Sequence, residues 1–361
     1  MGDKVDKRTK SKLNRRSFLV AAGTTALAAP FIKPSWANER VITVRDPGGP
    51  YGPALKAAFY DPFYEETGIK AVGLQASHSP TGQIKAMVDA KNYVWDGADL
   101  SKSDVDLLAN SGYVEPVAGK GGLGKYASQI PETLRSEFVV GVGTYATVMA
   151  YRTDAMGKNP PKNWMDFWNV KDFPGERSIR KHPIDTLEAA LMADGVPKEN
   201  LYPLDVDRAF KSLDKIKEQI TIWWTGGAQT SQLLKTGEVD CLPTWNGRAQ
   251  VAIDDGAPVK LVWDGAIYSY VGWAILKGGP NVDLMREFIE FCSNGERQAV
   301  VTKYAADGPA NPNAYDHIDP ARAEVLPSNP KFLPKMVASD TAWWGKNKEP
   351  VQEKFETWLL A

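Results

Sequence analysis

Residues 40–76 read RVITVRDPGGPYGPALKAAFYDPFYEETGIKAVGLQA, and their pattern is the best indication of the fold class. Residues 40–45 alternate in the manner of a strand, and the Asp-Pro-Gly-Gly that ends it predicts a loop. Residues 51–67 carry apolar side chains at helical spacing and stop at Gly68, a C-cap signal. Residues 69–75 predict the next strand. Strand, helix and strand in this order are typical of a largely parallel α/β sheet.

The same alternation continues along the chain, in two series joined by extended segments at 138–142 and 147–151. Two such series predict two lobes, with a ligand cleft beyond the carboxyl ends of the strands. The other predicted helices are 83–90, 103–111, 163–168, 186–193, 206–219, 230–235, 247–255, 283–294 and 350–360, and the other strands are 95–100, 221–224, 238–243, 259–263 and 273–276.

The first 37 residues are typical of a twin-arginine signal peptide. A basic segment leads to the adjacent Arg15 and Arg16, an apolar stretch follows at 20–32, and Ser35-Trp36-Ala37 supplies small residues for cleavage. The apolar stretch is short for a permanent membrane span. The twin-arginine route exports folded proteins, so we expect the protein in the periplasm.

Removal of that segment changes the charge of the chain. It holds eight Lys/Arg and two Asp/Glu, so the 43 basic and 44 acidic residues of the whole chain fall to 35 and 42, a net charge of −7. A negative chain argues against nucleic acid as a partner. The remaining 324 or so residues predict two domains or one unusually large one. The two cysteines, Cys241 and Cys292, either form one disulfide or stay buried as free thiols.

Signals for catalysis are weak, which argues against an enzyme. The chain lacks a Gly-x-Ser-x-Gly motif, a His-Glu-x-x-His motif, a Walker loop and a Cys-x-x-Cys motif. Its three histidines have no metal-ligand spacing, so neither a metal nor a cofactor is expected. Residues 141–146 match a relaxed dinucleotide pattern, but a strand follows them where the pattern needs a helix.

Tryptophan is abundant, with 12 residues. Such a number indicates a heavy core or an aromatic-lined site, and about half of these side chains are expected in the core. Trp245 and Trp344 lie beside polar residues in predicted loops and are the candidates for exposure in the cleft. Aromatic walls around a carboxylate suit an organic cation.

Several segments, in their order and spacing, resemble the periplasmic solute-binding proteins of ABC importers, specifically the polyamine (spermidine/putrescine) group and its iron- and phosphonate-binding relatives. The segments are Phe63–Ile69, Ser111–Val114, Trp164–Trp168 with Phe173–Gly175, Gly237–Asp240 with Trp245-Asn246-Gly247-Arg248, and Pro258–Trp263.

The resemblance implies a two-lobed periplasmic-binding-protein fold of type II. Each lobe would be a mixed sheet flanked by helices, and the two would close on the ligand about a hinge. Lobe 1 would comprise residues 38–147 and 273–312, and lobe 2 residues 148–272 and 313–361. The protein would be a monomer that delivers its ligand to an ABC permease in the inner membrane.

The resemblance also implies an amine ligand held by carboxylates and aromatic rings, and a polyamine or a related amine is the expected ligand. Trp245 matches the family's tryptophan, and Asp185 falls on one of the family's carboxylates. His182 stands where a second carboxylate belongs, and Val271 stands where a third belongs. Two of three acidic anchors are therefore missing, and an unpaired buried ammonium is costly.

Alternatives follow from these departures. The same fold could bind an organic anion, a phosphonate or a metal, which the basic run Arg180-Lys181-His182 favours, or the chain could be an exported hydrolase or redox enzyme. The predicted ligand-binding residues are Gly49, Tyr51, Ser79 and Ser101 on the first lobe, and Asp185, Trp224, Thr225, Trp245, Tyr270 and Trp344 on the second.

Overall fold

The computed structural model describes residues 40–48, 51–76, 80–157 and 159–361. The predicted signal peptide and two predicted site residues, Gly49 and Ser79, lie outside the described residues. Residues 40–361 form one compact unit, and the strands described in it join in one 12-stranded sheet of central order β2-β1-β3-β10-β6-β9-β7-β8.

The first part of the chain builds the parallel unit that its sequence predicts. β1 (Val41–Asp46) pairs in parallel with β2 (Lys70–Gln75) and with β3 (Gly97–Ser101). The predicted helix between β1 and β2 is present in three sections, with a π-helical turn in its middle. The helices of this part are α1 (Tyr51–Leu55), η3 (Lys56–Tyr60), α2 (Asp61–Thr67), α3 (Thr81–Ala90) and α4 (Lys102–Asn110).

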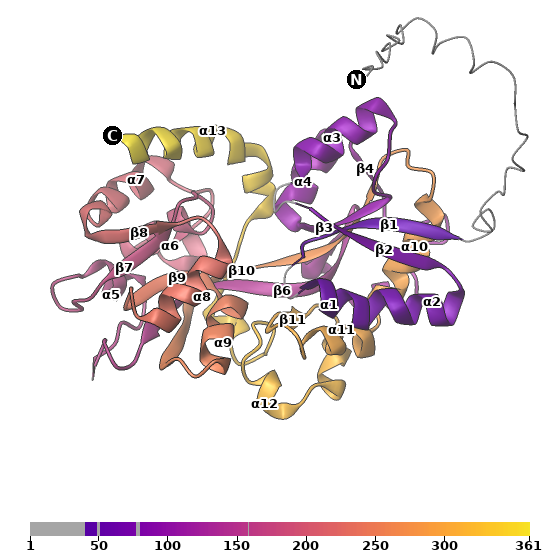
Figure 1. The fold of residues 1–361 in the computed structure, drawn as a ribbon. Coiled ribbons are helices and arrows are strands. Elements are labelled where there is room, and N and C mark those ends of the chain that lie inside the picture. Colours follow the sequence, from indigo (N-terminus) through magenta and orange to yellow (C-terminus); the bar gives the residue numbers. More distant parts are fainter. Residues whose placement is uncertain (1–39, 49–50, 77–79, 158) are drawn as a thin grey trace, which may run out of the picture. The chain divides into compact units, whose positions relative to one another are not determined.

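Two long antiparallel strands, β6 (Val139–Arg152) and β10 (Val259–Leu276), run through the middle of the molecule (Figure 1). The sequence predicts two separate strands in each of these stretches, and the structure corrects this. In β10 the residues between Val262 and Ile267 form an irregularity in the ladder, and Gly265 takes a left-handed φ of 70° there. A glycine within polar residues predicts a turn, but here it makes a bulge that lets the strand continue.

The second α/β series forms the other half of the sheet. β9 (Cys241–Trp245) pairs antiparallel with β6, whereas β7 (Arg177–Arg180) pairs in parallel with β8 (Ile220–Trp224) and with β9. The prediction of a largely parallel sheet is therefore correct at the two ends of the sheet but not at its centre. The helices of this part are α5 (Trp164–Trp168), α6 (Thr186–Ala193), α7 (Val206–Asp214), α8 (Gly227–Thr236) and α9 (Asn246–Asp254).

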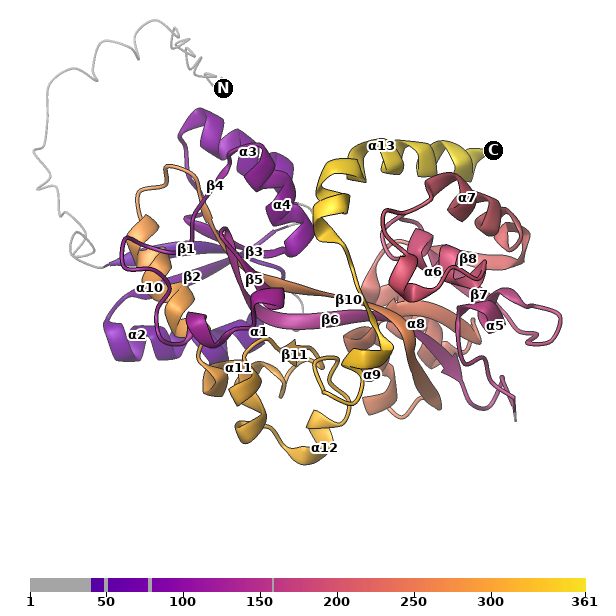
Figure 2. The same cartoon turned by 180° about the vertical axis from the view of Figure 1, so that it is seen from behind.

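After β10 the chain returns to both halves. α10 (Val282–Cys292) and α11 (Gly295–Val301) pack beside the first part, and α13 (Thr341–Leu360) lies over the second, with its first turns beside α4 (Figures 1 and 2). The short elements are β4 (Val114–Glu115), β5 (Arg135–Ser136), β11 (Gly308–Pro309), β12 (Val337–Ala338), α12 (Pro320–Ala323) and the 3₁₀ turns η4 (Ala127–Gln129), η5 (Glu132–Leu134), η6 (Lys198–Asn200), η7 (Lys217–Gln219), η8 (Pro312–His317) and η9 (Leu333–Lys335).

The last helix starts earlier than the sequence predicts. Pro350 favours a helix start, but it lies inside α13. The helix begins after Asp340, whose side chain accepts a hydrogen bond from the backbone N–H of Trp343. Trp344 is therefore in the first turns of a helix rather than in a loop.

The buried side chains form clusters on both sides of the long strands. Phe59, Phe63, Trp273 and Phe288 belong to a core around β1 and β10, and a separate core packs α6, α7 and α13 together. Cys241 and Cys292 belong to different cores and are buried free thiols. Of the two alternatives that the sequence leaves open, the structure therefore shows free thiols and not a disulfide. No described helix is long and apolar enough to cross a bilayer.

Candidate functional site

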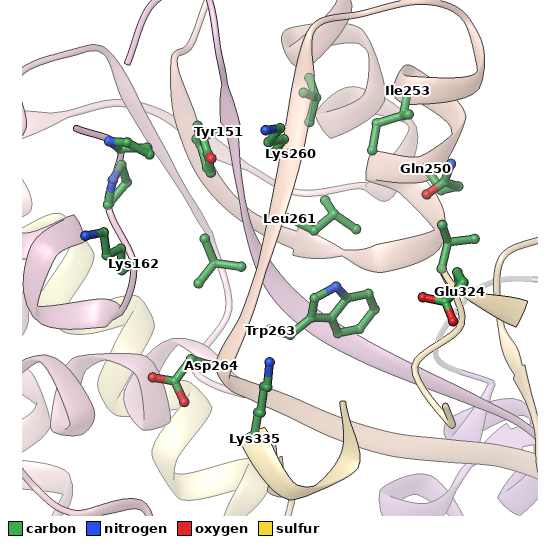
Figure 3. Close-up of a pocket in the computed structure, with 15 residues that line it drawn as sticks. Tyr151, Lys162, Gln250, Ile253, Lys260, Leu261, Trp263, Asp264, Glu324 and Lys335 are labelled. Carbon is green, nitrogen blue, oxygen red and sulfur yellow. The ribbon is translucent and has the colours of Figure 1, made fainter. Parts of the chain in front are cut away.

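Two hollows stand out in the described part of the chain. One is a groove of about 630 Å³ along β10, where Leu261 and Trp263 face the opening and Lys335 points toward Trp263 (Figure 3). The indole of Trp263 stacks on the ring of Phe332, with centroids 4.3 Å apart. Every charged residue that lines this groove is exposed: Lys162, Lys260, Asp264, Glu324 and Lys335. Solvated charges of this kind are ordinary protein surface.

The second hollow, which we call the cavity, has a volume of about 510 Å³ and a different character. Side chains from distant parts of the chain converge on it, and five of its charged residues are buried, which is typical of a binding site. It is lined by Arg45, Pro47, Tyr51, Leu55, Phe59, Asp99, Leu100, Ser101, Ser103, Asp104, Val142, Gly143, Tyr145, Arg180, His182, Ile184, Asp185, Trp245, Gly247, Arg248, Val271, Val301, Asp307, Lys348 and Gln352.

The ends of the strands position this lining. β1 and β3 carry Arg45 and Ser101 to one wall, and β7 and β9 carry Arg180 and Trp245 to the other. The carboxyl ends of parallel strands meet at one edge of a sheet, where ligands of open α/β folds bind. Ser101 also caps α4, because its hydroxyl accepts a hydrogen bond from the backbone N–H of Asp104.

The turn Trp245-Asn246-Gly247-Arg248 is fixed by its buried asparagine. The Asn246 side-chain oxygen accepts a hydrogen bond of 2.9 Å from the backbone N–H of Ala146, and its amide donates one of 2.6 Å to the carbonyl of Ala306. A side chain at position 247 would be crowded, because a Cβ there would lie 3.2 Å from Asp307 Oδ1. The start of α9 is thereby tied to β6 and to residues 302–307 between α11 and β11, a segment that we call the crossover. It presents Arg248 to the cavity.

The guanidinium of Arg248 has no hydrogen-bond or ion-pair partner among the described residues. Arginine is the side chain best suited to a carboxylate, because its planar fork can bind both oxygens at once. The side chain is half-buried, so a partner in the cavity would be partly shielded from water.

Trp245 forms an aromatic wall with a cation on one side and a second indole beside it. The guanidinium carbon of Arg180 lies 5.0 Å from the centroid of the Trp245 ring, and Trp224 meets that ring edge-on at 5.6 Å. Trp224 is fully buried, and its Nε1 donates a hydrogen bond to the carbonyl of Pro243. Trp224 therefore supports Trp245 from behind and does not line the cavity.

Two buried carboxyls face the cavity from the first part of the chain and the crossover. Burial raises the pKa of Asp99 to about 7 and the pKa of Asp307 to about 6. Asp307 Oδ2 accepts a hydrogen bond of 2.9 Å from the hydroxyl of Tyr51. That hydrogen bond and the charge of Arg248 both act to lower the pKa of Asp307 and thus favour its ionised form.

A third buried carboxyl, Asp185, precedes α6 in a left-handed backbone conformation with φ of 69°. Its Oδ2 accepts a hydrogen bond of 2.7 Å from the Thr147 hydroxyl and lies 3.7 Å from a guanidinium nitrogen of Arg180. Burial raises the pKa of this carboxyl, and the charge of Arg180 acts against that. Aspartate tolerates the left-handed region better than most residues, and strain of this kind is found at binding sites.

The remaining corner of the cavity joins the last helix to the first part of the chain. Lys348 Nζ on α13 donates a hydrogen bond of 2.9 Å to Asp104 Oδ1 on α4. His182 lies close by, and its pKa is lowered to about 2 by burial and by the charges of Arg180 and Lys348. No group of three or more His, Cys, Asp or Glu side chains that could hold a metal ion occurs among the described residues.

The predicted site residues are thus partly brought together. Tyr51, Ser101, Asp185 and Trp245 line the cavity. Thr225 is exposed before α8, and Tyr270 is buried in the core. The expectation that Trp344 is exposed in the cleft is wrong, because helix α13 buries it completely and its indole bonds Glu188.

Other cavity residues are absent from the predicted set, chiefly Arg248, Asp307, Lys348 and Tyr145. The sequence contains a pattern that indicates Arg248 as a site residue, because Arg248 is in the first turn of a predicted helix that directly follows a predicted strand. Asp307 and Lys348 had none, because the crossover and the last helix reach the cavity only through the tertiary fold.

Comparison with known proteins agrees with this geometry. Residues 58–332 match the family model described as bacterial extracellular solute-binding protein. The chain is 33% identical over 333 residues to the gamma-aminobutyric acid-binding protein of Pseudomonas aeruginosa, which covers 91% of this chain and 93% of that protein. It is 22% identical over 237 residues to the spermidine/putrescine-binding periplasmic protein of Escherichia coli, covering 63% of this chain and 67% of that protein.

Solved structures show the same two-lobed fold. An ABC transporter substrate-binding protein from Bradyrhizobium japonicum superimposes with a TM-score of 0.83 at 37% identity, covering 88% of this chain and 99% of that one. The GABA receptor Atu4243 superimposes with a TM-score of 0.80 at 31% identity, covering 89% of this chain and 98% of that one. The chain therefore belongs to the family of bacterial extracellular solute-binding proteins: it is the substrate-binding component of an ABC importer for a small solute and not an enzyme.

Proposed function

We propose that the protein captures a small amino-acid-like zwitterion between its two lobes, with the solute's carboxylate on Arg248. The observation that carries this proposal is the guanidinium of Arg248, which faces the cavity and has no partner among the described residues. A solute carboxylate would meet it in bidentate fashion and would complete an otherwise unpaired charge.

The other charges of the lining support a zwitterion over a polyamine. Basic and acidic side chains balance, four against four: Arg45, Arg180, Arg248 and Lys348 face Asp99, Asp104, Asp185 and Asp307. A polyamine would bring two or more positive charges into a lining with no excess of carboxylates, and an uncompensated buried charge is costly. A zwitterion adds no net charge to the cavity.

Asp307 is the proposed partner of the solute's ammonium group. Its Oδ2 holds the Tyr51 hydroxyl, and its Oδ1 lies beside Gly247, where only a hydrogen occupies the space that a side chain would fill. Arg248 is near enough for its charge to lower the pKa of Asp307. Carboxylate and ammonium could therefore be recognised at neighbouring points, with Trp245 as an aromatic wall.

The protein with 33% identity that binds gamma-aminobutyric acid supports the same solute class. The predicted lobes, 38–147 with 273–312 and 148–272 with 313–361, place Asp307 and Arg248 on different lobes. Contacts from one solute to both would favour the closed population. Delivery to the permease would follow in the periplasm, after export by the twin-arginine route.

The test is a titration of the purified protein by calorimetry and by thermal shift. The solutes are gamma-aminobutyrate, L-glutamate, L-alanine, putrescine and spermidine. At 100 times its dissociation constant a true ligand adds about 2.7 kcal/mol of stability. We expect this for at least one zwitterion, and we expect its loss in R248Q but not in R208Q, a control at an exposed arginine of α7 that pairs with Asp194. Tight putrescine or spermidine binding that survives R248Q would refute the proposal.

A further inference from the structure

His182 is held in one orientation by its own loop. Its Nδ1 accepts a hydrogen bond of 3.2 Å from the backbone N–H of Ile184, two residues on. The loop is fixed at both ends, because the backbone N–H of Lys181 donates to the carbonyl of Trp224 at 2.8 Å and the Thr147 hydroxyl bonds Asp185. The ring therefore lines the cavity as part of a rigid turn.

The hydrogen bond at Nδ1 also fixes the position of the ring proton. A neutral imidazole has one donor and one acceptor nitrogen, and Nδ1 is the acceptor here, so the proton is on Nε2. The ring stays neutral at physiological pH because burial and the neighbouring cations Arg180 and Lys348 lower its pKa to about 2. The acidic groups of this corner, Asp185 and Asp104, are themselves held in ion pairs with those two cations.

We infer that His182 is a specificity-determining residue, whose Nε2–H donates a hydrogen bond to an oxygen of the solute. The nitrogen has no hydrogen-bond partner among the described residues, and the ring lines the cavity. An ammonium group has no lone pair to accept this hydrogen bond, so this corner disfavours the far end of a diamine. An oxygen acceptor fits it: a carboxylate or an amide carbonyl.

This inference rests on the proposed function, which places the solute's own carboxylate and ammonium at Arg248 and Asp307. Arg248 opens α9, whereas His182 lies in the loop between β7 and α6. The solute class is therefore an amino acid with an additional oxygen-bearing group. L-Glutamate and L-glutamine carry such a group, as carboxylate and as amide respectively, whereas L-alanine has the α-carboxylate and α-ammonium without it.

Two variants separate the cavity donor from the loop contact. Asparagine has polar atoms near the Nδ1 position only, so H182N keeps an acceptor for the Ile184 N–H and loses the cavity donor. Glutamine reaches the Nε2 position, so H182Q keeps a donor in the cavity and loses the loop contact. A purely structural role would make H182Q the more damaging change, and a role in solute recognition would make H182N the more damaging one.

The experiment measures the affinities of the wild type, H182N and H182Q for L-glutamate, L-glutamine and L-alanine by calorimetry. We expect H182N to weaken the binding of glutamate or glutamine about 3- to 10-fold, the effect of one neutral hydrogen bond, with less than a 2-fold change for L-alanine. We expect H182Q to restore most of the loss. Equal losses for all three solutes, or no binding of either oxygen-bearing amino acid by the wild type, would overturn the inference.

A second measurement does not need a solute. Long-range ¹H–¹⁵N spectra of the protein, with H182N used to assign the signal, should show His182 as the Nε2–H tautomer, unchanged from pH 5 to pH 8. A proton on Nδ1, or a titration near pH 6.5, would overturn the inference at its base. If the spectra show the Nε2–H tautomer but R248Q leaves solute binding unchanged, the proposed function is refuted while the geometry of His182 stands.

Discussion

The indole Nε1 of Trp344 on α13 donates a hydrogen bond of 2.6 Å to Oε1 of Glu188 on α6. Both residues are completely buried, and the Tyr202 hydroxyl donates to the same oxygen at 2.6 Å. Oε2 of Glu188 has no partner among the described residues. The last helix is therefore attached to α6 through a buried carboxyl of which one oxygen has no hydrogen-bond partner among the described residues.

Trp344→Phe should destabilise the protein by about 1–3 kcal/mol, because it removes a donor from a buried carboxyl. Urea unfolding measures the loss. In a double-mutant cycle with Glu188→Leu, which removes the acceptor, the two changes should couple by more than about 0.5 kcal/mol. Strict additivity would show that the hydrogen bond does not contribute to stability.

The free energy of unfolding of the Glu188→Gln variant should increase relative to that of the wild type as pH rises. Burial raises the pKa of Glu188 from 4.5 to about 7. Between these values the folded protein keeps a proton that the unfolded chain loses, so wild-type stability falls as pH rises through this window and levels off above pH 7. Glutamine does not titrate, so the difference in unfolding free energy between variant and wild type should shift by about 3 kcal/mol in favour of the variant from pH 4.5 to pH 8. Glu199→Gln, at an exposed position, should show no such trend, and an equal trend there would contradict the assignment.

Trp245→Ala should weaken solute binding by about 10-fold without unfolding the protein, since it removes the aromatic wall beside Arg180. The matched control is Trp263→Ala, in the groove of Figure 3, where the indole stacks on Phe332. Calorimetry with the best zwitterion from the panel above should separate the two. Equal affinities of the wild type and the Trp245 variant would place the solute elsewhere.

Lys348→Met should destabilise the protein by about 2 kcal/mol, because it leaves Asp104 without its cation in a mostly buried position. The side chains of Lys348 and Asp104 are 19% and 9% exposed, whereas those of Lys354 and Asp207, also paired from α13, are 49% and 78% exposed. Lys354→Met should therefore cost under about 0.5 kcal/mol. Thermal unfolding of the two variants side by side tests this, and similar costs would show that burial of the pair is unimportant.

Local patterns predicted most elements, and they failed where long-range pairing overrode them. The helix at 186–193 has the predicted bounds, because Leu187, Ala190 and Leu191 lie at helical spacing and are buried in one core. The strands at 259–263 and 273–276 are one strand, because pairing with β6 extends through the bulge at Gly265. The sequence predicts a helix start at Pro350, but Asp340 caps α13 and Trp344 is buried in its first turns, so the helix starts nine residues earlier.

From the sequence one can predict the α/β alternation, the family and three residues that line the cavity, Ser101, Asp185 and Trp245. These features depend on local periodicity and on short motifs, which a chain carries without its fold. By contrast, the burial of Trp224 and Trp344 and the exposure of Arg248, Asp307 and Lys348 to the cavity follow from the tertiary structure alone. Whether a polar side chain is paired, and whether an indole is wall or core, depends on neighbours more than 50 residues away, such as Glu188 for Trp344 and Asp104 for Lys348.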